Sequence, residues 1–164
     1  METVHKLETT MASWYERAPH LPKSGQEWLA KNVWWIALVG AIIGVLGVLG
    51  IAAALVFGTA LLGMSFGIFG VAAGAALTFI VLLNVAFSIA TVILVSLSVQ
   101  PLKTQQKRGW ELLFITMLLD AALIVLTLLA GWNFGSFLSG VIGLVIGGYF
   151  LFEIRQYFAL NQRA

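Results

Sequence analysis

Hydrophobic and charged positions are unevenly distributed along this chain, and one long uncharged stretch dominates the pattern. Residues 32–102 contain no Asp, Glu, Lys, Arg or His. A bilayer core is roughly 30 Å thick and needs about 20 helical residues per crossing, so a stretch of this length holds at least two membrane spans. We therefore expect an integral membrane protein.

The apolar pattern predicts four transmembrane helices, at residues 33–57, 75–99, 110–130 and 137–158. Between the first two, residues 58–74 are rich in Gly, Ala, Ser and Thr, and they form either a connection or a helix extension. The expected fold class is all-α, with the four helices in an antiparallel bundle that follows a short amphipathic N-terminal helix.

Basic residues decide between three and four spans, because lysine and arginine concentrate in short cytoplasmic loops. Two spans before the middle cluster of basic residues place every cluster on one side of the membrane, whereas three spans would place the last two clusters outside. We therefore predict four spans with both termini cytoplasmic. The first span is too long for a cleaved signal peptide and should remain as an anchor. The three clusters are Lys6, Arg17, Lys23 and Lys31; Lys103, Lys107 and Arg108; and Arg155 and Arg163.

The N-terminal residues 1–23 are predicted to form an amphipathic helix and a proline-containing linker, ahead of a membrane domain at 24–160 and a cytoplasmic tail at 161–164. Apolar residues of the helix return every three to four positions, as expected for one helical face. The helix is expected to lie on the cytoplasmic leaflet or to cap the bundle. Ser24 and Glu27 have the spacing of a capping box, which predicts the start of the first membrane helix. The apolar positions are Val4, Leu7, Met11, Trp14 and Ala18.

At the other end, Glu153 and Arg155 lie where the fourth span should leave the lipid. We expect them to reach the interface as long side chains commonly do, without forming a site. His5 and His20 have no cluster of candidate ligands around them, so exposed histidines are expected. The aromatic residues near the end of the fourth span are typical of an interfacial belt; they are Tyr149, Tyr157 and Phe158.

Composition and charge exclude several classes of function. The chain is 60% hydrophobic and only 10% charged, against about 25% charged residues in soluble domains. A net charge of +2, with basic and acidic residues interspersed near the N-terminus, does not predict nucleic-acid binding. The absence of cysteine removes disulfides, thiolate metal sites and lipidation on sulfur.

Asp120 interrupts the apolar pattern at the centre of the third predicted span. A charged side chain there costs about 2.5–3.5 kcal/mol on insertion scales, so Asp120 should face protein or water. Thr116 lies one turn before it and Thr127 two turns after it. A matching polar stripe follows i, i+4 and i+7 along the second span; its members are Asn84, Ser88 and Thr91.

Because the second and third spans are consecutive and antiparallel, we expect Asp120 to hydrogen-bond Asn84 or Ser88. Three interpretations stay open for this cluster. It is a packing clasp between helices, a proton- or cation-binding carboxyl on a transport path, or a contact to another subunit.

Small residues recur every three or four positions in the first and fourth spans. This spacing lets helix backbones approach closely, so these two spans should pack on each other or on a second copy of the protein. The two sets are Gly40, Gly44, Gly47 and Gly50, and Ser136, Gly140, Gly143 and Gly147.

The spans contain no histidine, no cysteine and no pair of acids, so neither an enzyme nor a metal or haem cofactor is expected. The leading hypothesis is a non-enzymatic protein that acts by helix packing or association, as a scaffold or accessory subunit. The alternative is a small oligomeric transporter or channel that uses Asp120 for proton or cation coupling. A third class is a module that binds lipid or another apolar ligand. The expected partners are membrane lipid and a second copy or another membrane protein.

Overall fold

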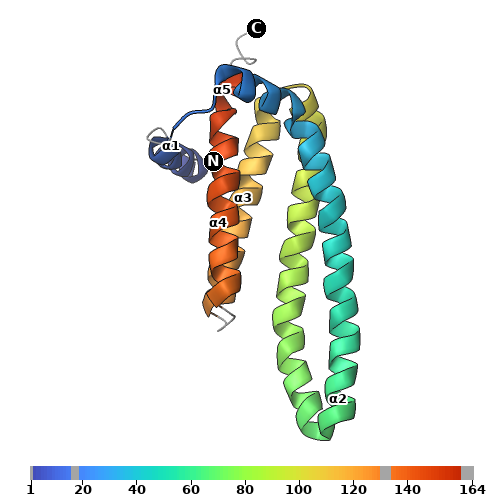
Figure 1. Ribbon diagram of the computed structural model, residues 1–164. Helices are drawn as coiled ribbons and strands as arrows, with labels where there is room; N and C mark the ends of the chain where they lie inside the picture. Colours follow the sequence, from blue (N-terminus) through green and yellow to red (C-terminus); the bar gives the residue numbers. More distant parts are fainter. Residues whose placement is uncertain (1, 16–18, 130–133, 160–164) are drawn as a thin grey trace.

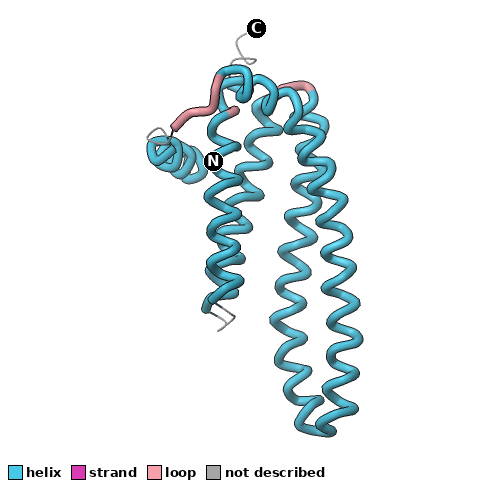
Figure 2. Tube along the Cα trace, in the orientation of Figure 1, coloured by secondary structure: helices cyan, strands magenta, loops and turns pink. Residues whose placement is uncertain are grey.

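The computed structural model describes residues 2–15, 19–129 and 134–159, and these residues are almost entirely helical (Figures 1 and 2). The described ranges contain no strand, which confirms the all-α prediction. The predicted tail at 161–164 lies outside them. In chain order the helices are α1 (Glu2–Tyr15), α2 (Lys23–Lys103), α3 (Lys107–Leu129), α4 (Phe134–Glu153) and α5 (Arg155–Ala159).

Three helical segments within the described residues are long and apolar enough to cross a membrane. They are Lys23–Val71, Val81–Lys103 and Lys107–Leu126. A shorter apolar helix covers Phe137–Glu153. The chain therefore has the helices of a multi-pass membrane protein.

α2 is a helical hairpin whose two arms lie side by side and reverse direction at Gly67 (Figure 1). Gly67 has φ 57° and ψ −134°, a backbone conformation that residues with a Cβ rarely adopt. The segment 58–74 is helical on both sides of this residue. A Cβ built at Gly70 would collide with the carbonyl of Leu62, so the close approach after the reversal also requires glycine.

The predicted capping box is wrong, because α2 begins at Lys23 with Pro22 as its N-cap and without a side-chain cap. The Pro22 carbonyl accepts hydrogen bonds from the backbone N–H groups of Gly25 (2.8 Å) and Gln26 (3.1 Å). Ser24 therefore lies inside the first turn, where its hydroxyl cannot take the N-cap position.

The end of the chain also differs from the predicted continuous helix. α4 ends at Glu153, and the short helix α5 begins at Arg155 after a turn at Ile154. The break lets Ile154 and Phe158 both enter the core, each with 1% of its surface exposed. Burial of these apolar side chains outweighs the loss of helical continuity over one residue.

α3 occupies the centre of the molecule, in contact with α2 on one side and α4 on the other. The core lies at the end of the molecule that carries the charged residues and the turn between α2 and α3. Trp110 is fully buried there, donates its indole N–H to the Leu151 carbonyl at 2.8 Å and stacks on Phe114. The core residues are Ala30, Val33, Ala37, Leu102, Trp110, Phe114, Met117, Leu151, Ile154 and Phe158.

The reversal of α2 generates a stability prediction for Gly67→Ala. A Cβ in this conformation stores strain of about 1–3 kcal/mol, so the variant should unfold more readily in detergent micelles, measured by circular dichroism. Gly58→Ala is the matched control, because a Cβ there meets open space within a helix and alanine favours helix. Equal unfolding midpoints for the two variants would contradict the assigned turn.

Candidate functional site

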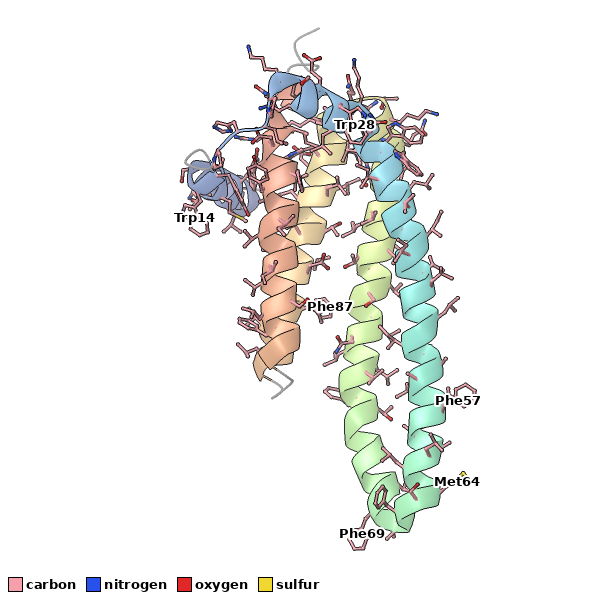
Figure 3. All side chains as sticks on the ribbon, in the orientation of Figure 1. Trp14, Trp28, Phe57, Met64, Phe69 and Phe87 are labelled. Carbon is pink, nitrogen blue, oxygen red and sulfur yellow. The ribbon has the colours of Figure 1, made fainter. Side chains whose placement is uncertain are left out.

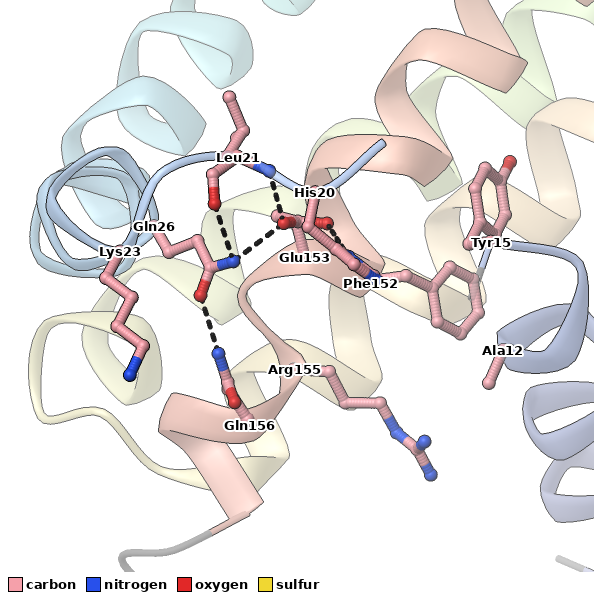
Figure 4. Close-up of a pocket in the computed structure, with 10 residues that line it drawn as sticks. All are labelled: Ala12, Tyr15, His20, Leu21, Lys23, Gln26, Phe152, Glu153, Arg155 and Gln156. Atoms are coloured by element: carbon pink, nitrogen blue, oxygen red, sulfur yellow. Dashed lines mark hydrogen bonds and ion pairs between the residues drawn. The ribbon is translucent and has the colours of Figure 1, made fainter. Parts of the chain in front are cut away.

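A pocket of about 730 Å³ lies at the charged end of the molecule, where α1, the linker, the start of α2, the end of α4 and α5 meet (Figure 4). The linker crosses the end of α4 because Pro19 and Pro22 exclude a continuous helix from α1 into α2. The lining residues are Ala12, Tyr15, His20, Leu21, Lys23, Gln26, Phe152, Glu153, Arg155 and Gln156.

Glu153 is the centre of this pocket and is only 8% exposed. One carboxylate oxygen, Oε1, accepts hydrogen bonds from the Leu21 backbone N–H and from Gln26 Nε2, both at 2.7 Å. The other, Oε2, lies 3.2 Å from His20 Nδ1. Glu153 therefore fastens the linker and the first turn of α2 to the end of α4 (Figure 4).

A second buried acid, Glu8, joins α1 to the start of α5. Both Nε and Nη2 of Arg155 contact Glu8 Oε1, at 2.9 and 2.7 Å. On the same side of α1, the Tyr15 ring stacks on Phe152 with centroids 5.1 Å apart. Burial raises the pKa of the Tyr15 phenol above its ordinary value. α1 is thus fixed to α4 and α5 by one ion pair and one aromatic stack.

These contacts correct the expectation that the end of the fourth span only anchors the protein at the interface. Glu153 is buried, and Arg155 pairs with Glu8. Among the aromatic residues, Phe158 belongs to the core, and the Tyr149 hydroxyl donates to the Pro19 carbonyl at 2.6 Å. His20 is exposed as expected, although its ring contacts Glu153.

The polar groups that line the pocket form hydrogen bonds and ion pairs with other residues of the chain. The buried carboxylate of Glu153 already accepts hydrogen bonds from Leu21 and Gln26, and Arg155, which also lines the pocket, is paired with Glu8. Among the described residues, no group of three or more His, Asp or Glu side chains is placed to hold a metal ion. The pocket therefore holds segments together, and the polar groups within the spans remain the stronger candidates for a site.

Asp120 lies in a groove of about 510 Å³ between α3 and α4. The groove brings together residues from two features that were predicted separately. Asp120 and Thr116 belong to the polar cluster, and three further lining residues are packing glycines of α4. Those glycines are Gly140, Gly143 and Gly147.

The polar cluster also reaches α2, through Thr91. Its hydroxyl lies 3.3 Å from Asp120 Oδ1, within hydrogen-bond distance. Ser88 and Asn84, the donors that the sequence favoured, lie one and two turns before Thr91 on the same arm of α2 and are half-buried. Thr116 is buried and donates to the Leu112 carbonyl of its own helix at 3.0 Å. The Thr127 and Ser136 side chains lie outside the described residues.

The glycines contact other helices than the sequence suggested. A Cβ at Gly44 would lie 2.7 Å from Val92 in the other arm of α2, and one at Gly140 would lie 3.0 Å from Ile124 in α3. These two glycines therefore support packing within the hairpin and between α3 and α4. A Cβ would meet open space at the other five named glycines, which are Gly40, Gly47, Gly50, Gly143 and Gly147.

Sequence reasoning missed the buried polar residues at the charged end, namely Glu8, Gln26 and Glu153. Their partners lie more than a hundred positions away in the chain, so no local spacing reveals them. One signal was available for Glu153, since it lies between Phe152 and Ile154 in an otherwise apolar segment.

The chain matches no protein-family model, no curated protein and no solved structure.

Glu153→Leu tests whether the buried carboxylate holds the charged end together. The substitution leaves the Leu21 N–H and one of the two amide N–H groups of Gln26 without an acceptor, while the Gln26 amide keeps its hydrogen bond to the Leu21 carbonyl. An unsatisfied buried donor costs about 1–3 kcal/mol. We expect a lower unfolding midpoint in micelles. Glu27→Leu is the control, because Glu27 is exposed on the first turns of α2. A midpoint as high as that of the control would refute the role given to Glu153.

Proposed function

We propose that this protein is a non-enzymatic, four-span membrane protein that acts by association, as a scaffold or accessory subunit, through the α2 hairpin. In the proposed topology both arms of α2, α3 and α4 cross the membrane as an antiparallel bundle, with both termini in the cytoplasm. The basic clusters support this topology, because Lys31 belongs to the first turns of α2, while Lys103 and Lys107 end α2 and begin α3. The start of α2 and the turn between α2 and α3 lie at the end of the molecule where α1 and α5 also lie (Figure 1).

The observation that carries the proposal is the length of the hairpin. The uncharged part of its first arm, from Asn32 to Gly67, is about 54 Å long at about 1.5 Å per residue. α4, with 20 residues, is about 30 Å long by the same measure, which equals the thickness of a bilayer core. The hairpin extends well past the described ends of α3 and α4 (Figure 1).

The extended part of the hairpin, here called the tip, covers residues 56–79. It exposes large apolar side chains, with Met64 85% and Phe69 83% exposed, and Figure 3 shows Phe57, Met64 and Phe69 pointing outward. Tilting the molecule to submerge the tip would tilt α3 and α4 by the same angle. An apolar surface of this kind typically marks an interaction site, so we assign the tip to contact with a partner.

The partner is either another membrane protein or a second copy of this chain. The open space at Gly40 and Gly47 supports close approach of another helix to the first arm of α2. Large apolar residues beside these glycines are also exposed, including Ile43 and Leu46. A partner that covers the tip would thus find a continuous surface along the same arm.

Replacing both Met64 and Phe69 with serine tests this proposal. We expect the tagged wild-type chain, extracted from its native membrane after cross-linking, to carry a stoichiometric partner or a second copy. The double variant should lose that species and keep its unfolding midpoint, since both side chains are exposed. Ile142→Ser, at an exposed position of α4, is the control and should retain the complex. A wild-type chain isolated only as a monomer would contradict the proposal.

Transport is the second candidate function, and the groove between α3 and α4 supports it. Asp120 lines the groove beside three glycines, which leave room near the carboxyl group. A protomer with four spans is too thin to enclose a path alone, so this function also requires association.

Proton and cation flux into liposomes tests this second function. Asp120→Asn should abolish carboxyl-dependent flux while keeping an oxygen that accepts the Thr91 hydrogen bond. Glu111→Gln is the control, because Glu111 belongs to the same helix but is exposed at the charged end, near Lys107. Equal flux for wild type and Asp120→Asn, or no flux above empty liposomes, would exclude transport through Asp120.

A further inference from the structure

α1 lies alongside the apolar part of α4 and not beyond its end. The Tyr15 hydroxyl donates to the Val145 carbonyl at 3.4 Å, and its ring stacks on Phe152. Val145 comes eight residues before Glu153, which is about 12 Å along a helix. Both contact residues belong to the apolar helix Phe137–Glu153. The C-terminal end of α1 is therefore level with the outermost turns of a membrane helix.

α1 also runs across the direction of α3 and α4, and Figure 1 shows it nearly end-on. Its contact with α4 and α5 uses Glu8 and Tyr15, which lie seven residues apart on one face. Glu8 is only 5% exposed there. The side of α1 that meets the rest of the molecule is thus a mixed polar and aromatic face.

Leu7 and Trp14 form a different face of α1. They are also seven residues apart, so their directions agree within about 20°. Leu7 is 43% exposed and Trp14 is 68% exposed. In Figure 3, Trp14 extends from α1 toward the level of the far ends of α3 and α4, which is the direction of the bilayer centre. Val4 and Ala18, predicted for the same face, lie outside the described side chains.

We propose that the Leu7–Trp14 face of α1 binds the lipid of the membrane leaflet at the charged end. An interfacial amphipathic helix lies with its apolar face about 5–10 Å below the headgroup boundary, and the contacts of Tyr15 place α1 at that depth along α4. Tryptophan is enriched at this level of membrane proteins. The polar residues Lys6 and Ser13 lie about 100° around the helix and are exposed, as an interfacial orientation requires.

Lipid, and not a second protein, is the occupant that this geometry favours. The face points toward the bilayer at the depth of the outer turns of α4, where lipid surrounds any exposed surface. The Glu8–Arg155 pair and the Tyr15–Phe152 stack hold the helix at that depth, so the face meets lipid wherever α4 spans the membrane. The inference requires that α4 spans, and it is independent of the partner proposed for the tip.

The chain has no cysteine, so single cysteines can be labelled without further changes. Leu7→Cys, Trp14→Cys and the control Ser13→Cys would each carry the fluorophore NBD in the full-length protein, reconstituted in phosphatidylcholine vesicles. Leu7→Cys keeps Trp14, and Trp14→Cys keeps Leu7, so each variant retains half of the face. We expect blue-shifted emission at positions 7 and 14, strong quenching there by lipid with a nitroxide near its headgroup, and weak quenching by aqueous iodide.

Position 13 should show the reverse, with emission close to that in water and strong quenching by iodide. Iodide quenching at positions 7 and 14 equal to that at 13 would overturn the proposal, because α1 would then lie in water. Protection that rises with the protein-to-lipid ratio and resists the nitroxide lipid would also overturn it, because a second copy would then cover the face. Loss of association through the tip would leave the fluorescence and quenching at positions 7, 13 and 14 unchanged.

Discussion

The backbone must satisfy its own hydrogen bonds wherever lipid replaces water, and this constraint shapes the whole molecule. Across the uncharged residues 32–102, a helix is the local structure that meets it. A chain of this length has to turn back, however, and a reversal interrupts the helical ladder. Gly67 reduces that interruption to a single residue with positive φ, and Gly70 allows the two arms to approach just after it. The long hairpin therefore keeps its helical hydrogen bonds on both sides of the reversal at Gly67.

Side-chain contacts are distributed as unevenly as the charges. The buried acids Glu8 and Glu153 and the core around Trp110 all lie at the charged end. The described side chains of the tip include large apolar residues but contribute none to the buried core. The position of the tip therefore depends on the backbone hydrogen bonds of the two arms and on what surrounds it. Local stability should follow this gradient, because regions with few buried apolar contacts open most readily. The charged end, where side chains contact one another, carries α1. The opposite end carries the tip.

The sequence predicted the all-α class, the amphipathic helix and the location of Asp120 within a span, because each follows from local periodicity. It failed at positions whose environment is set by distant residues. Its neighbours in the sequence predict that Glu153 is an interface anchor, but its carboxylate accepts hydrogen bonds from Leu21 and Gln26. The spacing of Ser24 predicts a helix cap, but Pro22, one residue before the helix, determines the start of α2. The glycines of α4 carry a generic spacing, which gave no means of telling that they would face Asp120 across a groove.

The energetics of Asp120 bear on the choice between a clasp and a site. A charged side chain at the membrane centre costs about 2.5–3.5 kcal/mol on insertion scales. Interhelical hydrogen bonds in lipid average about 0.6 kcal/mol and reach about 1.7 kcal/mol. The contact with Thr91, at 3.3 Å, belongs at the weaker end of that range and does not offset the cost. The rest of that cost is avoided if the carboxyl group binds a proton, which removes the charge, or is offset by solvent that reaches it through the groove beside Gly143 and Gly147. The Thr91 contact by itself therefore does not account for a charged Asp120 between these helices.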